Sequence, residues 1–194
     1  MSKLLVFAGP NGSGKSTITS GISLFGKYVN ADSIKKHLLC TDEVAAVIAE
    51  ETREHYLSLD MDFTFETVLS TTRNIDLMKR AKEKGYYIVC MYVLTHNPQI
   101  NIKRVQKRVD SGGHGVPPEK ISTRYIKALK LFPNIVPLCD ELYVFDNSLD
   151  SEENGASMII RSIKGNIEMY PNEVWNENMI ECLVMGIYSD KYIP

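Results

Sequence analysis

The residue types and spacing that most clearly carry chemistry lie near the start of the chain. Residues 9–16 satisfy the pattern G-x-x-x-x-G-K-[ST], between an apolar run, residues 4–8, and a helical pattern that continues to Leu24. Glycines in such a loop let backbone N–H groups converge on an anion, and the helix that follows turns its positive end toward it. The pattern predicts a polyphosphate site made of Gly9, Pro10, Asn11, Gly12, Ser13, Gly14, Lys15, Ser16 and Thr17.

Two side chains of this loop have distinct expected roles. Lys15 is expected to contact the β- and γ-phosphates of a nucleoside triphosphate, and the Ser16 hydroxyl to be a ligand of Mg²⁺. Magnesium takes few protein oxygens and completes its shell with phosphate and water. The alternative is a glycine-rich turn after a buried strand. It does not explain the Lys-Ser pair, nor the presence of both a strand pattern before the loop and a helical pattern after it. The sequence therefore predicts ATP and Mg²⁺ as cofactors.

Phosphoryl transfer also needs a group that orients or deprotonates the acceptor, and the ends of later strands supply candidates. Asp32 follows an apolar segment and is the expected base, although an aspartate there could instead cap the next helix. Glu66 and Thr67 are expected to bind the acceptor; alternatively Glu66 is an exposed strand-end carboxylate and Thr67 a helix cap. Asn147 follows the last core strand and is expected to help bind the nucleotide. Carboxyl ends of parallel strands share one edge, so these residues should converge.

Cations that stabilise the migrating phosphoryl group are expected around a break in the helical region 98–131. Arg104 and Arg108 lie one turn apart, directly before residues 111–118, which hold three glycines and two prolines. Arg124 lies beyond the break and His114 within it. A flexible segment between basic helices is typical of a lid that brings cations onto phosphate. Surface ion pairs for the arginines, and an ordinary loop position for His114, are the alternatives.

The elements that must position these residues alternate between strands and helices. Strands are predicted at residues 4–8, 28–31, 62–65, 86–94 and 141–145, and helices at 42–57, 72–84, 98–109 and 119–131. Asn97-Pro98 is typical of a helix start. A hairpin at 158–163 and 167–170 and a closing helix at 171–185 follow. The alternation predicts an α/β fold of the P-loop NTPase class, with a mostly parallel sheet in a three-layer α/β/α arrangement.

Length and composition are those of one domain. With 194 residues and 44% hydrophobic content, the chain can bury one good core. We expect a kinase core over residues 1–148, with a helical lid around 98–131. The C-terminal hairpin and helix, residues 149–194, are expected to pack on the same domain.

Charge and cysteine usage exclude several function classes. A net charge of −2 provides no general attraction to nucleic acid or to an anionic membrane. The four cysteines are far apart and form no C-x-x-C pair, which argues against a zinc site and a disulfide framework. The first apolar segment is too short for a signal peptide, and no run approaches the length of a membrane helix. We therefore expect a cytoplasmic protein that acts on a small molecule.

With these residues assembled, the chain resembles the zeta toxin family of P-loop kinases. The resemblance covers residues 3 to 148 and rests on the loop Gly9–Ser16, on Asn30-Ala31-Asp32, on Phe65-Glu66-Thr67, and on Lys84-Gly85-Tyr86 leading into Met91-Tyr92-Val93. It implies phosphorylation of a sugar hydroxyl of UDP-N-acetylglucosamine. It also implies that the residue matching Asp32 is the base, that Lys15 binds phosphate and that Glu66 contacts the substrate.

The lid departs from the family pattern. Family members carry two lid arginines on either side of a loop, whereas here Arg104 or Arg108 precedes a Gly-Gly-His-Gly-Val-Pro segment and the next arginine is Arg124. The departure indicates a zeta-like branch with its own lid, and it leaves the acceptor, the toxin role and an antitoxin partner open. A polynucleotide or nucleoside kinase and a non-catalytic, nucleotide-dependent regulatory protein remain the alternatives.

Overall fold

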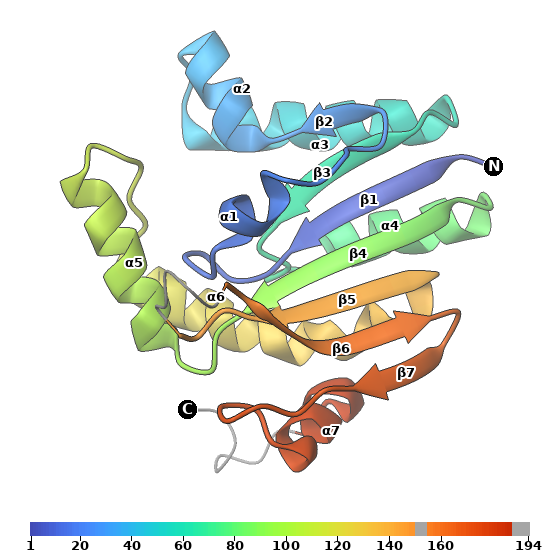
Figure 1. Cartoon of the computed structure of the whole chain (residues 1–194). Helices are drawn as coiled ribbons and strands as arrows, with labels where there is room; N and C mark the ends of the chain where they lie inside the picture. The colour runs from blue at the N-terminus through green and yellow to red at the C-terminus, as the bar shows by residue number, and fades with distance from the viewer. Residues whose placement is uncertain (150–154, 188–194) are drawn as a thin grey trace.

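The computed structural model describes residues 1–149 and 155–187, and its strands form one sheet in the order β2-β3-β1-β4-β5-β6-β7 (Figure 1). The first five strands in this order pair in parallel, whereas β6 and β7 are antiparallel. The strands are β1 (Lys3–Ala8), β2 (Lys27–Val29), β3 (Phe63–Thr67), β4 (Tyr87–Leu94), β5 (Glu141–Asp146), β6 (Ser157–Ile163) and β7 (Asn166–Met169).

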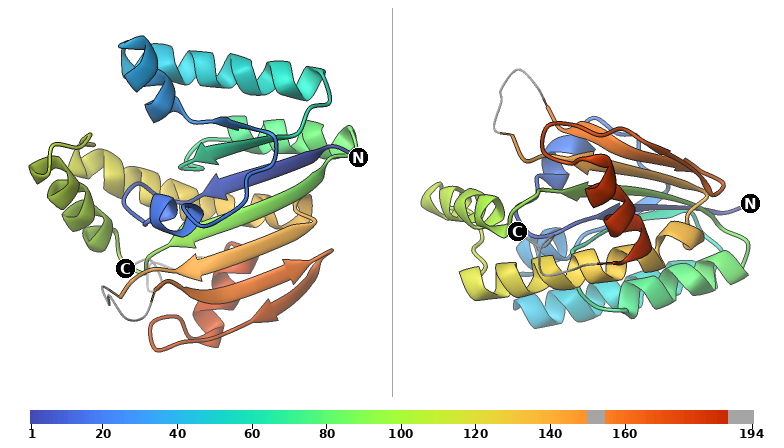
Figure 2. Two further views of the ribbon diagram at one scale, coloured as in Figure 1. Left: turned by 45° about the horizontal axis from the view of Figure 1, so that its top comes forward. Right: turned by 90° about the horizontal axis from the view of Figure 1, so that it is seen from below.

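Helices cover the two faces of the sheet unequally. Figure 2 shows α3, α4, α6 and α7 together on one face, with α1 on the other. The predicted mostly parallel α/β fold with three layers is thus confirmed, and its third layer is thin. The helices are α1 (Lys15–Thr19), α2 (Ala31–Leu38), α3 (Asp42–Ser58), α4 (Arg73–Glu83), α5 (Pro98–Asp110), α6 (Pro118–Leu131) and α7 (Glu177–Met185).

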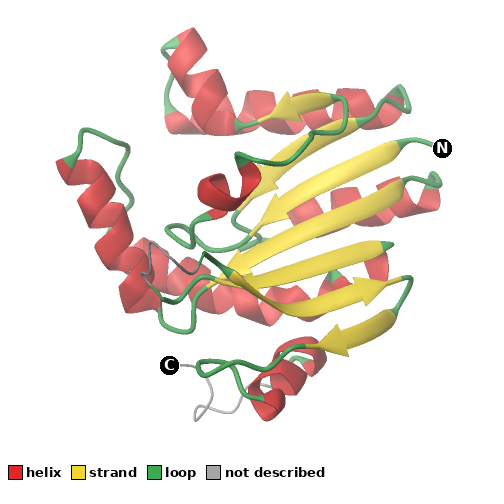
Figure 3. Ribbon diagram, in the orientation of Figure 1, coloured by secondary structure: helices red, strands yellow, loops and turns green. Residues whose placement is uncertain are grey.

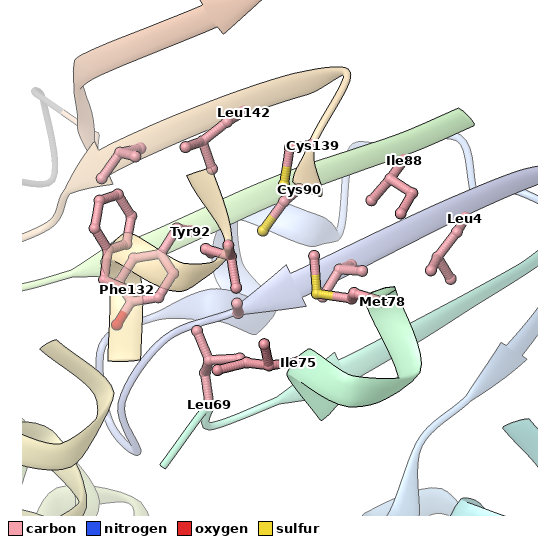
Figure 4. Close-up of a cluster of buried hydrophobic side chains, with 14 of the residues drawn as sticks. Leu4, Leu69, Ile75, Met78, Ile88, Cys90, Tyr92, Phe132, Cys139 and Leu142 are labelled. Atoms are coloured by element: carbon pink, nitrogen blue, oxygen red, sulfur yellow. The ribbon is translucent and has the colours of Figure 1, made fainter. Parts of the chain in front are cut away.

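Alternation along β1 divides the interior into a large and a small cluster. Leu4, Val6 and Ala8 face the large cluster under the four helices, part of which is drawn in Figure 4. Leu5 and Phe7 face the smaller cluster beneath the segment that follows α1. Because successive side chains of a strand point to opposite faces, a strand in the middle of the sheet must be apolar on both. The unbroken apolar run that leads to the phosphate loop follows from this position.

Local hydrogen bonds explain where the observed elements differ from the expected ones. The helix after the phosphate loop, expected to reach Leu24, ends at Thr19. The hydroxyls of Thr19 and Ser20 donate to the carbonyls of Ser16 and Thr17, and such bonds compete with helix propagation. The prediction of a longer first helix was therefore wrong.

Two asparagine caps shift other boundaries. The strand expected at residues 28–31 ends at Val29, because Asn30 is the N-cap of α2. The closing helix expected from residue 171 starts at Glu177, since the Asn176 side chain caps it. Asn97 caps α5 with Pro98 at the first position, as the sequence predicted.

The C-terminal region continues the same sheet and core. β6 pairs with β5, β7 pairs with β6, and Trp175, Ile180 and Leu183 join the large cluster. Of the C-terminal segment expected at 149–194, residues 150–154 and 188–194 lie outside the described residues. Among the described helices, none has the length and apolar character needed to cross a bilayer.

Replacing Phe132 tests the core under the phosphate-loop strands. This ring is fully buried and lies edge-on to Tyr92 with 4.9 Å between ring centroids. Phe132→Ala should lower the free energy of unfolding by about 3–5 kcal/mol, because it removes a buried ring and leaves a cavity. Urea denaturation would measure it, with Leu59→Ala as a surface control, since Leu59 is 55% exposed. A loss no larger than that of the control would contradict this packing.

Candidate active site

The backbone of the phosphate loop is packed so closely that glycine is required. At Gly9, with φ of 137°, an added Cβ would lie 2.0 Å from the Val93 carbonyl oxygen of β4. At Gly14, with φ of 94°, it would lie 2.1 Å from the Asn147 amide nitrogen. Positive φ values of this kind are strained for other residues. The loop is therefore held in shape by neighbours on both sides, and Gly14 starts α1 at the loop's end.

Lys15 lies buried against its own loop. Its Nζ donates to the carbonyls of Gly9 at 2.7 Å and Pro10 at 3.1 Å, and Glu66 Oε1 lies 3.8 Å away. Burial lowers the pKa of Lys15 below its usual value, while the negative charge of Glu66 opposes that shift and the charge of Arg108 adds to it. The ammonium group thus forms an ion pair with Glu66 at a distance beyond hydrogen bonding, while Lys15 lines a cavity beside the loop.

A cavity of about 750 Å³ opens beside the loop. Its walls come from the phosphate loop, α2, α3, β3, α5, the segment between α5 and α6, and α6. In Figure 1, α5 and the α2–α3 pair project past the strand ends on opposite sides of α1. The sequence-predicted site residues in its wall are Asn11, Gly12, Gly14, Lys15, Ser16, Thr17, Asp32, Glu66, Thr67, Arg104, Arg108, His114 and Arg124.

Four predicted residues lie behind the cavity wall. Gly9, Pro10 and Ser13 form the part of the loop that faces the protein interior, and they do not line the cavity. Asn147 also lies outside the wall; its side-chain amide donates to the Ser13 carbonyl at 2.8 Å. Here Asn147 supports the back of the phosphate loop instead of facing the cavity.

Asp32 is the second residue of α2, and its side chain is exposed at the cavity wall. The alternative that Asp32 caps this helix is wrong. Asn30 is the cap, because its Oδ1 accepts from the Ser33 N–H at 3.0 Å. Because the Asp32 carboxylate does not cap the helix, it stays exposed to solvent, where it can exchange a proton with water.

The end of β3 delivers Glu66 and Thr67 with different surroundings. The Glu66 side chain is only 26% exposed, and its Oε2 accepts from Tyr28 OH at 3.1 Å and from Asn30 Nδ2 at 3.0 Å. It is therefore an oriented carboxylate. The Thr67 hydroxyl accepts from the Leu69 N–H and the Asn74 amide, so it holds the turn that leads to α4.

The predicted lid residues converge on the same cavity from α5, α6 and the segment between them. Arg104 donates to the Asn147 carbonyl at 2.6 Å, and Arg124 approaches the Asn11 side chain at 3.4 Å. Arg108 is exposed at the end of α5 and lines the cavity. These three arginines thus line the same cavity as Asp32 and Glu66.

His114 reaches across the cavity to the opposite wall. Its Nε2 lies 3.7 Å from Asp42 Oδ2 at the start of α3, and Lys35 of α2 pairs with the same carboxylate at 2.7 Å. The segment between α5 and α6 therefore meets the α2–α3 pair. The His114 side chain touches a carboxylate instead of a core, as its position between glycines indicates.

Sequence reasoning missed the buried contacts that join α5 to the phosphate loop. Asn101 is fully buried; its amide donates to the Asn11 carbonyl at 2.8 Å and accepts from the Thr95 hydroxyl. Tyr125 of α6 donates to the Thr95 carbonyl at 2.6 Å. The available signal was an asparagine one turn before Val105, on the helix face that packs inward.

Comparison with known proteins supports the fold. No family model matches the sequence. An uncharacterized protein of Haemophilus influenzae is 29% identical over 138 residues, which are 63% of this chain and 92% of that protein. The AvrRxo1-ORF1:AvrRxo1-ORF2 complex with sulphate ions contains a chain with a TM-score of 0.72 at 15% identity, covering 98% of this chain and 66% of that one.

A second solved structure extends the comparison. A chain of the PezAT chromosomal toxin-antitoxin system of Streptococcus pneumoniae has a TM-score of 0.55 at 14% identity, over 99% of this chain and 82% of that one. The chain has the fold of zeta toxin-like P-loop kinases. It spans just under two thirds of the AvrRxo1 chain. The resemblance expected from the motifs is thus confirmed at the level of the P-loop kinase fold.

Replacing Asn101 tests the tie between α5 and the phosphate loop. Asn101→Leu keeps the size of the side chain but leaves the buried Asn11 carbonyl without its donor, so unfolding should become easier by about 1–3 kcal/mol. Urea denaturation would measure the change. Gln99→Leu, at an exposed position of the same helix, is the matched control. Equal stabilities of the two variants would show that the Asn101 contacts contribute nothing.

Proposed function

We propose that this P-loop kinase transfers the γ-phosphoryl group of ATP to a hydroxyl of a small polar acceptor. The supporting observation is that Lys15, Asp32 and Arg108 all line the same cavity. A phosphate-binding cation, a solvent-exposed carboxylate and a lid arginine in one volume are the parts that phosphoryl transfer requires. A structure of the AvrRxo1-ORF1:-ORF2 complex contains ATP, and the fold likeness supports the same cofactor here.

In this proposal the triphosphate lies on the loop at the start of α1. Lys15 would exchange its bonds with the Gly9 and Pro10 carbonyls for bonds with β- and γ-phosphate oxygens. The opposing lid arginines would stabilise negative charge that develops on the transferring group. Arg108 is the best placed of the three, because its charge already acts on Lys15.

Magnesium fits this site through the nucleotide. Ser16 is exposed in the cavity wall. Within residues 1–149 and 155–187 there is no group of three or more His, Cys, Asp or Glu side chains that could hold a metal ion. A magnesium ion would therefore take the Ser16 hydroxyl together with phosphate and water oxygens. When bound, it would neutralise charge on the β- and γ-phosphates.

Asp32 is proposed as the general base. Its carboxylate would accept the proton of the acceptor hydroxyl while that oxygen forms a bond to the γ-phosphorus. The bond between the γ-phosphorus and the bridging oxygen breaks, and ADP leaves with that electron pair. Because Asp32 is exposed, it can return the proton to water after each turnover.

The acceptor is proposed to lie between Asp32, Glu66 and Thr67. The resemblance to zeta toxins favours a nucleotide sugar such as UDP-N-acetylglucosamine. Glu66 offers a fixed carboxylate that can accept hydrogen bonds from sugar hydroxyls. Because both similar structures come from two-protein systems, the proposal extends to a partner protein that restrains the kinase.

Asp32→Asn tests the proposal directly. The amide cannot accept the proton, so transfer from γ-labelled ATP should fall about 100-fold or more. ATP affinity, measured with a fluorescent analogue, should stay within about twofold because the phosphate loop is untouched. The acceptors to assay are UDP-sugars, nucleosides, polyols and 5′-hydroxyl RNA. Asp76→Asn, at an exposed position of α4, is the control.

Other results of this assay would favour other functions. Full activity in Asp32→Asn would remove Asp32 from the role of base. Salt-sensitive transfer to 5′-hydroxyl RNA would indicate a polynucleotide kinase. Transfer to no acceptor, combined with capture of a partner only in the presence of nucleotide, would indicate a regulatory protein instead.

A further inference from the structure

The side chain of Asn30 contacts two parts of the site with its two ends. Its Oδ1 accepts from the Ser33 N–H at 3.0 Å and caps α2. Its Nδ2 donates to Glu66 Oε2 at 3.0 Å and approaches Tyr28 OH at 3.1 Å. Asn30 is half-buried and lines the cavity. One amide thus connects the helix that carries Asp32 with the carboxylate at the end of β3.

The capping bond lies directly beside Asp32, at the start of a helix that is otherwise held by Ala31 and Ile34 against the large cluster and by the Lys35–Asp42 ion pair. No side chain of α2, all of which the structure describes, is buried. An uncapped helix start leaves N–H groups without partners and frays. Asp32 is the second residue of this helix, so the Asn30 cap helps to fix the turn that carries its carboxylate.

The bonds to Glu66 control its distance from Lys15. Glu66 Oε2 is held by Asn30 and by Tyr28, whereas Oε1 stays 3.8 Å from Lys15 Nζ. Burial and the charge of Glu66 raise the pKa of Tyr28 to about 12, so its hydroxyl remains a donor. Without the Asn30 donor, Tyr28 alone holds Oε2 among these two partners, and Glu66 can turn more easily toward Lys15 to form a close, charge-assisted pair. Such a pair would compete with phosphate for the ammonium group.

We propose that Asn30 is a positioning residue with two functions. It caps α2 to place Asp32, and it holds Glu66 away from a close ion pair with Lys15, which keeps Lys15 available for phosphate. The catalytic consequence rests on the proposed kinase function. The consequence for phosphate binding does not, because it concerns ATP affinity alone.

Conservative variants separate the two functions. Asn30→Ser keeps an oxygen that can cap α2 but removes the amide donor to Glu66, whereas Asn30→Ala removes both. Asn176→Ser is the matched control, because Asn176 caps α7 through the same bond, to the Met179 N–H, and does not line the cavity.

The measurements are the dissociation constant of a fluorescent ATP analogue, the melting temperature and the turnover of γ-labelled ATP. Asn30→Ser should raise the dissociation constant about fivefold with the melting temperature within about 2 °C of wild type. Asn30→Ala should lose the same affinity and also melt earlier. In a Glu66→Ala background, Asn30→Ser should change affinity less than about twofold, since no carboxylate remains to compete.

That dependence on Glu66 separates positioning from a merely structural role. Wild-type affinity in Asn30→Ser, or an equal loss with and without Glu66, would overturn the proposal. If wild type binds the analogue but transfers phosphate to nothing, the kinase function fails while the Asn30 proposal is still decided by affinity. If wild type does not bind the analogue, both are overturned.

Discussion

The close contact between the phosphate loop and its neighbours is the constraint on which the rest of the site depends. No side chain fits between Gly9 and the Val93 carbonyl, or between Gly14 and the Asn147 amide. The path of the loop is therefore decided by β4 and by the turn after β5. Because Lys15 bonds to carbonyls of this loop, its direction is decided there as well.

Strand order then divides the chemistry between two sides of the loop. β1 pairs with β3 on one side and with β4 on the other. The helix after β2 brings the carboxylate of Asp32, and the end of β3 brings that of Glu66, to the cavity wall. The chain that follows β4 brings Arg104 and Arg108 to the opposite wall. A phosphate on the loop would thus have carboxylates on one side and guanidinium groups on the other.

Sequence patterns predicted what depends on neighbours along the chain. The phosphate-loop pattern, the Asn97 cap and the fold class each follow from residues a few positions apart. The bonds of Asn101 to Asn11 and of Asn30 to Glu66 join residues 90 and 36 positions apart, and no local pattern records them. Periodicity also overestimated the length of α1, because the spacing of apolar residues contains no information on side-chain hydroxyls that bond to the backbone.

Electrostatics explains how a chain with a net charge of −2 can select a polyanion. Long-range attraction is absent, so selectivity must come from cations gathered within the cavity. Burial and the nearby charge of Arg108 disfavour the charged form of Lys15 and lower its pKa, and the charges of Glu66 and Asp32 offset this only in part. An anion placed between Lys15 and Arg108 would relieve the repulsion between these two cations and favour the ammonium form of Lys15. An anion at this place would therefore be favoured over an uncharged ligand of the same size.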